Sequence, residues 1–71
     1  MRLTKREVET YNIIKTFIRK NKYSPTYKEI AYLLGIHSIA AAFEYVKRLI
    51  YKGYISKELN VNRSIIILKK L

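Results

Sequence analysis

The chain has 71 residues, 49% of them hydrophobic, and its 15 lysines and arginines against five acidic residues give a formal charge of +10. A chain this short forms one small domain over residues 1–71, because only about 60% of its unfolded surface becomes buried. The absence of cysteine excludes disulfides and thiolate zinc sites, and no apolar stretch resembles a membrane span or a secretory signal. We therefore expect a soluble cytoplasmic domain, without membrane contact, whose partners are polyanions.

A first helix is predicted from about residue 5 to residue 21. Apolar side chains recur there at helical spacing, as at Tyr11 and Ile14. Thr4 and Glu7 have the spacing of a capping box, in which each residue satisfies a backbone N–H group of the other. The helix is therefore expected to begin directly after Thr4.

A second, shorter helix is predicted over about residues 27–34. Pro25 interrupts the preceding periodicity, and Thr26 and Glu29 repeat the capping-box spacing. Gly35 is expected to end the helix, since a residue without a β-carbon adopts the left-handed conformation without steric cost.

A third helix is predicted over about residues 39–52, with Ser38 as its N-cap and Gly53 ending it as Gly35 ends the second. The apolar side, expected to be buried, holds Ile39, Ala42, Val46, Leu49 and Ile50. The opposite side, expected to face outward, holds Ala40, Glu44, Lys47, Arg48 and Tyr51.

A β-hairpin is predicted over about residues 54–68. Residues 54–57 and 64–68 have the composition of strands, and the loop between them contains Asn60 and Asn62, which tolerate left-handed backbone angles. Three helices followed by a hairpin predict a mostly α fold with a small β-hairpin, the three-helix winged helix-turn-helix.

A winged helix-turn-helix of high positive charge favours double-stranded DNA as the partner. In this fold the third helix enters the major groove, and small or polar side chains on its outer face let the backbone approach the bases. The residues expected to face bases are Ser38, Ala40, Ala41, Glu44 and Lys47. The residues expected to hold phosphates are Thr26, Lys28, Lys52 and Arg63, with Tyr27 and Tyr51 as further contact candidates.

The sequence resembles the DNA-binding domain of the LexA repressor family from Leu3 to about Leu68. The resemblance is carried by three segments at matched spacing. They are Leu3-Thr4-x-Arg6, then Ser24-Pro25-Thr26-x-x-Glu29-Ile30-Ala31-x-x-Leu34-Gly35, and then Ser38-x-x-Ala41-Ala42-x-Glu44 with Lys47, Leu49, Lys52 and Gly53; Arg63-x-Ile65 matches in the hairpin. This kinship implies a transcriptional repressor that reads a palindromic operator as a homodimer. It also implies that Ser38, Ala41 and Glu44, with Asn62 and Arg63 of the wing, contact DNA.

Departures from the family pattern bear on the operator and on dimerisation. Ala40 and Phe43 stand where the family commonly has asparagine and glutamate, so the operator is expected to differ from the usual one. Phe43 either contacts a thymine methyl group or flanks the core. A self-cleaving second domain, which dimerises relatives that respond to DNA damage, cannot be housed in 71 residues. The chain is therefore either an excised domain or a stand-alone relative, and a stand-alone relative would need another dimer surface. Ile66 and Leu68 either form an apolar edge for a second copy or pack inward.

Other functions fit the sequence less well. An enzyme is not expected, because His37 is the only histidine and no aspartate or cysteine accompanies it; no metal, cofactor or small-molecule ligand is indicated. Double-stranded RNA is disfavoured because its narrow major groove excludes a helix. The main alternative is a winged-helix module that binds or inhibits another protein, suggested by the apolar Leu33, Phe43 and Ile66.

Overall fold

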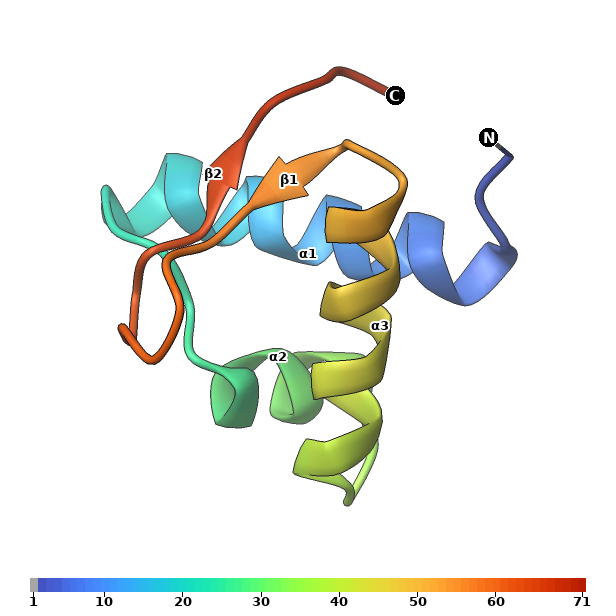
Figure 1. Ribbon diagram of the computed structural model, residues 1–71. Helices are drawn as coiled ribbons and strands as arrows, with labels where there is room; N and C mark the ends of the chain where they lie inside the picture. Colours follow the sequence, from blue (N-terminus) through green and yellow to red (C-terminus); the bar gives the residue numbers. More distant parts are fainter. Residues whose placement is uncertain (1) are drawn as a thin grey trace.

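The helices begin where their capping residues predict. A computed structural model describes residues 2–71 and contains α1 (Lys5–Asn21), α2 (Tyr27–Leu34) and α3 (Ile39–Tyr51) (Figure 1). Both predicted capping boxes are present: in each, the threonine hydroxyl accepts from the glutamate N–H at 3.2 Å and the carboxylate accepts from the threonine N–H at 2.9 Å. At the start of α3 the Ser38 hydroxyl accepts from the N–H of Ala41 at 3.0 Å.

The ends of α2 and α3 share one backbone geometry. Gly35 and Gly53 have φ angles of 75° and 82°, and the N–H after each glycine donates to a carbonyl five residues earlier at 3.0 Å. This is the glycine-terminated helix end that the sequence predicts. Helix α3 ends at Tyr51, one residue before the predicted boundary.

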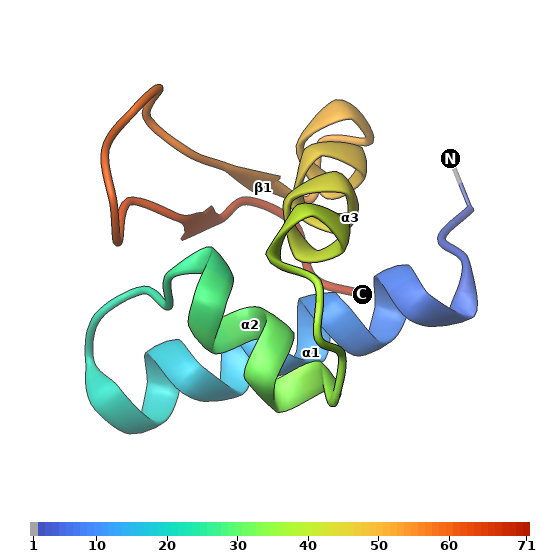
Figure 2. The same ribbon diagram turned by 90° about the horizontal axis from the view of Figure 1, so that it is seen from below.

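The core lies where the three helices and the hairpin meet. Each of the three helices packs against the other two, and Figure 2 views them nearly along the axis of α3. The buried apolar side chains are Tyr11, Ile14, Ile30, Ala31, Ala42, Val46, Leu49, Ile55 and Ile65. Tyr11 is fully buried, and its hydroxyl donates to the carbonyl of Lys69 at 2.8 Å, which ties the C-terminal segment to α1.

Two residues predicted on the buried side of α3 are exposed. Ile39 and Ile50 are 51% and 38% exposed, so this part of the burial prediction was wrong. The first turn of α3, which holds Ile39, extends beyond α2 (Figure 1). Ile50 lies one residue, about 100° around the helix, from the buried Leu49, and so falls at the edge of the apolar stripe.

The wing has shorter strands than predicted. β1 (Ile55–Ser56) pairs antiparallel with β2 (Ile66–Ile67), with Ile55 opposite Ile67. Beyond Ser56 the loop is held by side chains instead of a strand ladder: the Ser64 hydroxyl donates to the carbonyl of Val61 at 2.8 Å and accepts from the N–H of Glu58 at 3.2 Å.

The left-handed positions of the wing are only partly those predicted. Asn60 has a φ of 60°, but the second such residue is Arg63 (φ 56°) and not Asn62. Ile65 is buried and its N–H donates to the hydroxyl of the buried Ser24 at 3.1 Å. Because neighbours on an extended chain point to opposite sides, Ile66 then faces outward and is 59% exposed.

Candidate nucleic-acid interface

The outer face of α3 is open to solvent. Ser38, Ala40, Glu44 and Lys47 are exposed and Ala41 is half-buried, so all five predicted base-facing residues reach the surface. Their side chains are short over the first turn, which leaves the helix backbone accessible. The hydroxyl oxygen of Ser38 accepts the N-cap hydrogen bond, so the hydroxyl proton is still free to be donated to a ligand.

A groove runs from this face to the start of α2 and the wing. It has a volume of about 550 Å³. Its walls come from all three parts of the fold: Tyr27, Phe43, Lys47, Ile50, Lys57, Glu58, Leu59, Asn60 and Asn62. The arrangement brings the predicted contact residues Tyr27, Lys47 and Asn62 around one depression, although they are up to 35 positions apart in the sequence.

Aromatic packing forms the floor of this groove. The rings of Tyr27 and Phe43 meet edge to face, with centroids 5.2 Å apart at 75°. The ammonium group of Lys57 lies 5.3 Å from the centre of the Tyr27 ring. Burial raises the pKa of Tyr27, so its hydroxyl keeps its proton at neutral pH and remains a hydrogen-bond donor. Phe43 lies against Tyr27 and is 44% exposed, so part of its ring is open to solvent.

Lys52 faces inward, toward α1. Its Nζ lies 2.6 Å from Oε1 of Glu7 and donates to the carbonyl of Arg2 at 3.0 Å. Burial acts to raise the pKa of Glu7, but the hydrogen bonds from Lys52 and Thr4 and the charges of Lys52 and Arg48 outweigh it, so this pKa lies below its ordinary value. Lys52 therefore has an internal partner in addition to any external one.

Arg63 joins the wing to the start of α2. Its Nη1 and Nη2 atoms each donate to the carboxylate of Glu29 at 3.0 Å, and Nη1 also donates to the carbonyl of Ser24 at 3.1 Å. The guanidinium lies 4.7 Å from the centre of the Tyr23 ring. The hydrogen bonds from Arg63 and Thr26 lower the pKa of Glu29, so this pair is ionised at neutral pH and fixes the wing.

The remaining predicted contact residues surround the groove and α3. Lys28 and Tyr51 are exposed, Tyr51 at 77%. Thr26 is half-buried, and its hydroxyl accepts the N-cap hydrogen bond of α2. Among the ion pairs found within residues 2–71, none involves Lys28 or Lys47, so their charges are available to a ligand.

Sequence reasoning missed several side chains that line this groove, among them Lys57 and Leu59. Lys57 lies on the groove wall beside Tyr27, and Leu59, at the wing tip, is 88% exposed. Residues 58–62 were interpreted as a plain loop. The available signal was a pair of apolar residues, Leu59 and Val61, in a turn of a kind that ordinarily holds polar residues.

Two other kinds of site, a metal centre and a membrane-spanning helix, are not found in the described part of the chain. Within residues 2–71, no three histidine, aspartate or glutamate side chains gather closely enough to hold a metal ion. No helix over the same residues is both long and apolar enough to cross a bilayer.

Comparison with known proteins yields one family. Residues 1–64 match the family model described as the LexA DNA binding domain. The chain is similar to the LexA repressor of Syntrophobacter fumaroxidans, with 40% identity over 55 residues that form 78% of this chain and 27% of that protein. The LexA repressors of Koribacter versatilis and Colwellia psychrerythraea are 34% and 38% identical over 94% and 97% of this chain and 32% and 33% of their own length. The chain thus spans about a third or less of these relatives.

Proposed function

This chain belongs to the LexA DNA binding domain family, and from that membership we propose that it binds double-stranded DNA sequence-specifically as part of a transcriptional repressor. The observation that carries the proposal is the exposed outer face of α3, which continues through one groove to the start of α2 and the wing. A helix with a free face of small and cationic side chains fits the major groove. The domain's role is regulation and not catalysis.

The proposed contacts divide into those that read bases and those that hold the backbone. Ser38, Ala40, Ala41, Glu44 and Lys47 face the bases. Glu44 accepts a hydrogen bond from a cytosine amino group, or Lys47 donates to guanine, because these are the pairings that their chemistry allows. The residues that make phosphate contacts or the contact of the wing with DNA are Lys28, Tyr27, Tyr51 and Asn62. Thr26 belongs to the same group because it lies at the start of α2.

Lys52 and Arg63 contribute to the proposed DNA binding mainly by holding α3 and the wing in position. Each is engaged with a glutamate, at 17% and 40% side-chain exposure respectively. The Lys52 ammonium has one donor proton left after its two internal bonds, and the guanidinium of Arg63 has donors beyond those given to Glu29 and Ser24. We propose that they orient α3 and the wing first, and that phosphate contact uses the remaining donors.

The proposal includes a homodimer on a palindromic site. Ile66 of β2 and Leu68, directly after that strand, are 59% and 60% exposed, and we propose that they form the apolar edge on which the second copy packs. Two free copies repel each other because each carries a charge of +10. Neutralisation by phosphates removes this repulsion, so pairing is expected on DNA, in the cytoplasm at the nucleoid, and not in free solution.

Selection from a random duplex library tests the proposal. We expect an enriched motif with two-fold symmetry, and binding to that motif should weaken steeply between 50 and 200 mM salt, by on the order of 10³-fold if six phosphates are contacted. Failure to enrich any motif would contradict specific readout. The same selection with Lys47→Met serves as the matched control for the reading face.

A further inference from the structure

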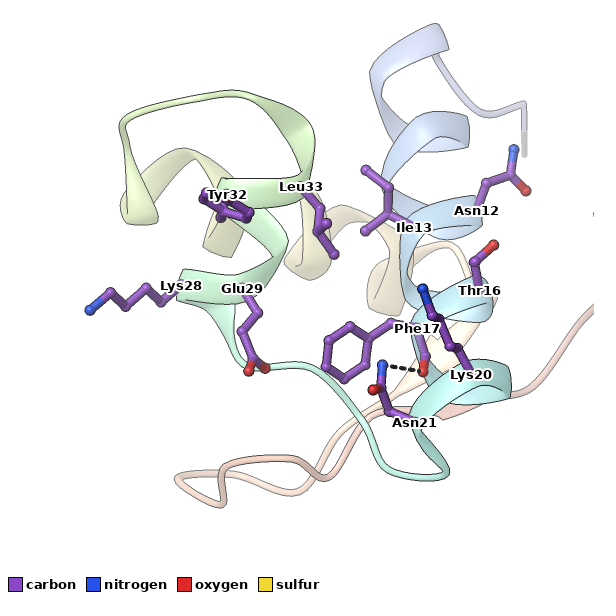
Figure 3. Close-up of a pocket in the computed structure, with 10 residues that line it drawn as sticks. All are labelled: Asn12, Ile13, Thr16, Phe17, Lys20, Asn21, Lys28, Glu29, Tyr32 and Leu33. Atoms are coloured by element: carbon purple, nitrogen blue, oxygen red, sulfur yellow. Dashed lines mark hydrogen bonds between the residues drawn. The ribbon is translucent and has the colours of Figure 1, made fainter.

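A second groove lies between α1 and α2, separate from the groove at the reading face. It has a volume of about 860 Å³, and every residue lining it belongs to one of these two helices. Figure 3 shows Ile13 and Phe17 of α1 and Leu33 of α2 pointing into the space between the helices. Helix α3 and the wing contribute nothing to its walls, and Lys28 is the one residue in its lining that also belongs to the proposed DNA contacts.

The floor of the groove is apolar and exposed. Leu33 and Tyr32 are 48% and 82% exposed, and Phe17 packs edge to face on Tyr23 with centroids 5.6 Å apart. Exposed apolar side chains gathered in one depression are characteristic of an interaction site. Anchors from two neighbouring helices suit the apolar stripe of a third helix, which projects a side chain every three or four residues.

The charged groups of the groove select the partner. Lys20 of α1 and Lys28 of α2 both line the groove, and Figure 3 shows the Lys28 side chain extending from α2 away from α1. The single carboxylate in the lining is Glu29, and it is already neutralised by two hydrogen bonds from Arg63. The walls are therefore net positive, which disfavours a second copy of this chain at +10 and favours an acidic partner.

We propose that the α1–α2 groove is a docking site for an acidic amphipathic helix of another protein. The apolar stripe of that helix lies on Phe17, Leu33 and Tyr32, and its carboxylates face Lys20 and Lys28. Docking leaves the exposed face of α3 free, and Lys28 is the one residue that the two proposed contacts share. The inference goes beyond the proposed DNA binding and does not depend on it.

The test uses a synthetic peptide of about four helical turns, with leucines at i, i+4 and i+7 and glutamates at the outer positions. A control peptide carries lysines in place of the glutamates. Amide shifts in ¹⁵N spectra locate binding, and fluorescence anisotropy measures affinity. We expect shifts at Phe17 and Leu33 with the acidic peptide only, and roughly tenfold weaker binding by Leu33→Lys and by Tyr32→Lys.

Controls separate this site from general charge attraction. Leu71→Lys adds the same charge at an apolar residue that is 55% exposed and lies outside the groove, and it should bind the acidic peptide as the parent does. Tyr32 is a surface residue, so its variant keeps the test valid where Leu33→Lys fails to fold. Shifts centred on α3, equal binding of the lysine peptide, or self-association lost on mutating Tyr32 would each overturn the proposal.

Discussion

The Nζ atom of Lys52 lies 2.6 Å from Oε1 of Glu7, and this ion pair joins the end of α3 to the first turn of α1. The Glu7 residue is 1% exposed and also closes the capping box with Thr4. One carboxylate thus fixes both where α1 begins and how α3 is held against it. The orientation of the proposed reading helix depends on this contact.

Lys52→Met is expected to destabilise the fold by about 3 kcal/mol, because it leaves the buried Glu7 carboxylate without its cation. In a domain of this size the melting temperature should fall by roughly 15 °C, measured by circular dichroism. DNA affinity measured well below that temperature should change less than stability does.

Lys47→Met is the matched control, five residues before Lys52 and exposed. Its stability should stay within about 0.5 kcal/mol of the parent, as for most surface substitutions. Its DNA affinity should fall, and the slope of log K against log salt should drop by about one if Lys47 contacts a phosphate. Equal melting temperatures for the two variants would refute the structural role of Lys52.

Stability should decline in acid because of Glu7 and Glu29. Both carboxylates have pKa values below their ordinary value of 4.5 in the folded chain. The unfolded chain therefore takes up protons first as pH falls, so the stabilisation is complete above about pH 5 and is lost as pH falls through the lowered pKa values.

The double variant Glu7→Gln/Glu29→Gln should show a lower melting temperature at pH 7 and a flatter profile between pH 5 and about pH 3. A glutamine side chain still accepts a hydrogen bond in a capping box, so these substitutions remove the charge of the carboxylate and keep the cap. Glu58→Gln, in the exposed wing loop, controls for losing a carboxylate. A double variant with the parent's slope would show that other groups govern acid unfolding.

The contact between Arg63 and Glu29 leads to a prediction about the wing. Arg63→Lys keeps the positive charge but cannot form two parallel hydrogen bonds to the carboxylate. If the paired hydrogen bonds from Arg63 to Glu29 orient the wing, Arg63→Lys and Arg63→Ala should both weaken operator binding by roughly tenfold. Both should also broaden the amide signals of the wing residues in ¹⁵N spectra. Recovery of affinity by lysine alone would instead indicate a simple phosphate contact.

The boundaries of the helices were predictable because their signals are local. Thr4 with Glu7, Thr26 with Glu29, and Gly35 each act within one helical turn, and the structure confirms all three. Family membership, predicted from three spaced segments, is confirmed as well.

The long-range pairs were not predictable from the same residues. Lys52 is 45 positions from Glu7 and Arg63 is 34 from Glu29, and each glutamate already had a sufficient local explanation as a cap. In the wing, the run from Ile65 to Leu68 is apolar throughout, so it carries no alternation to show which residue faces inward. The hydrogen bond from the Ile65 N–H to Ser24 decides that orientation.

Ala40 and Glu44 lie one turn apart on the exposed face of α3, and their replacement should alter specificity more than affinity. Glu44→Ala removes an acceptor and should relax the preference at one base pair, at a cost of about 1–3 kcal/mol on the preferred site. Ala40→Asn adds a group that pairs with adenine, so it should enrich a new base at one position of each half-site. Selection with the parent and both variants, followed by affinities on the resulting sites, measures these changes. Identical motifs from all three proteins would mean that this face of α3 does not read bases, whereas uniform weakening across all sequences would assign it to backbone contact.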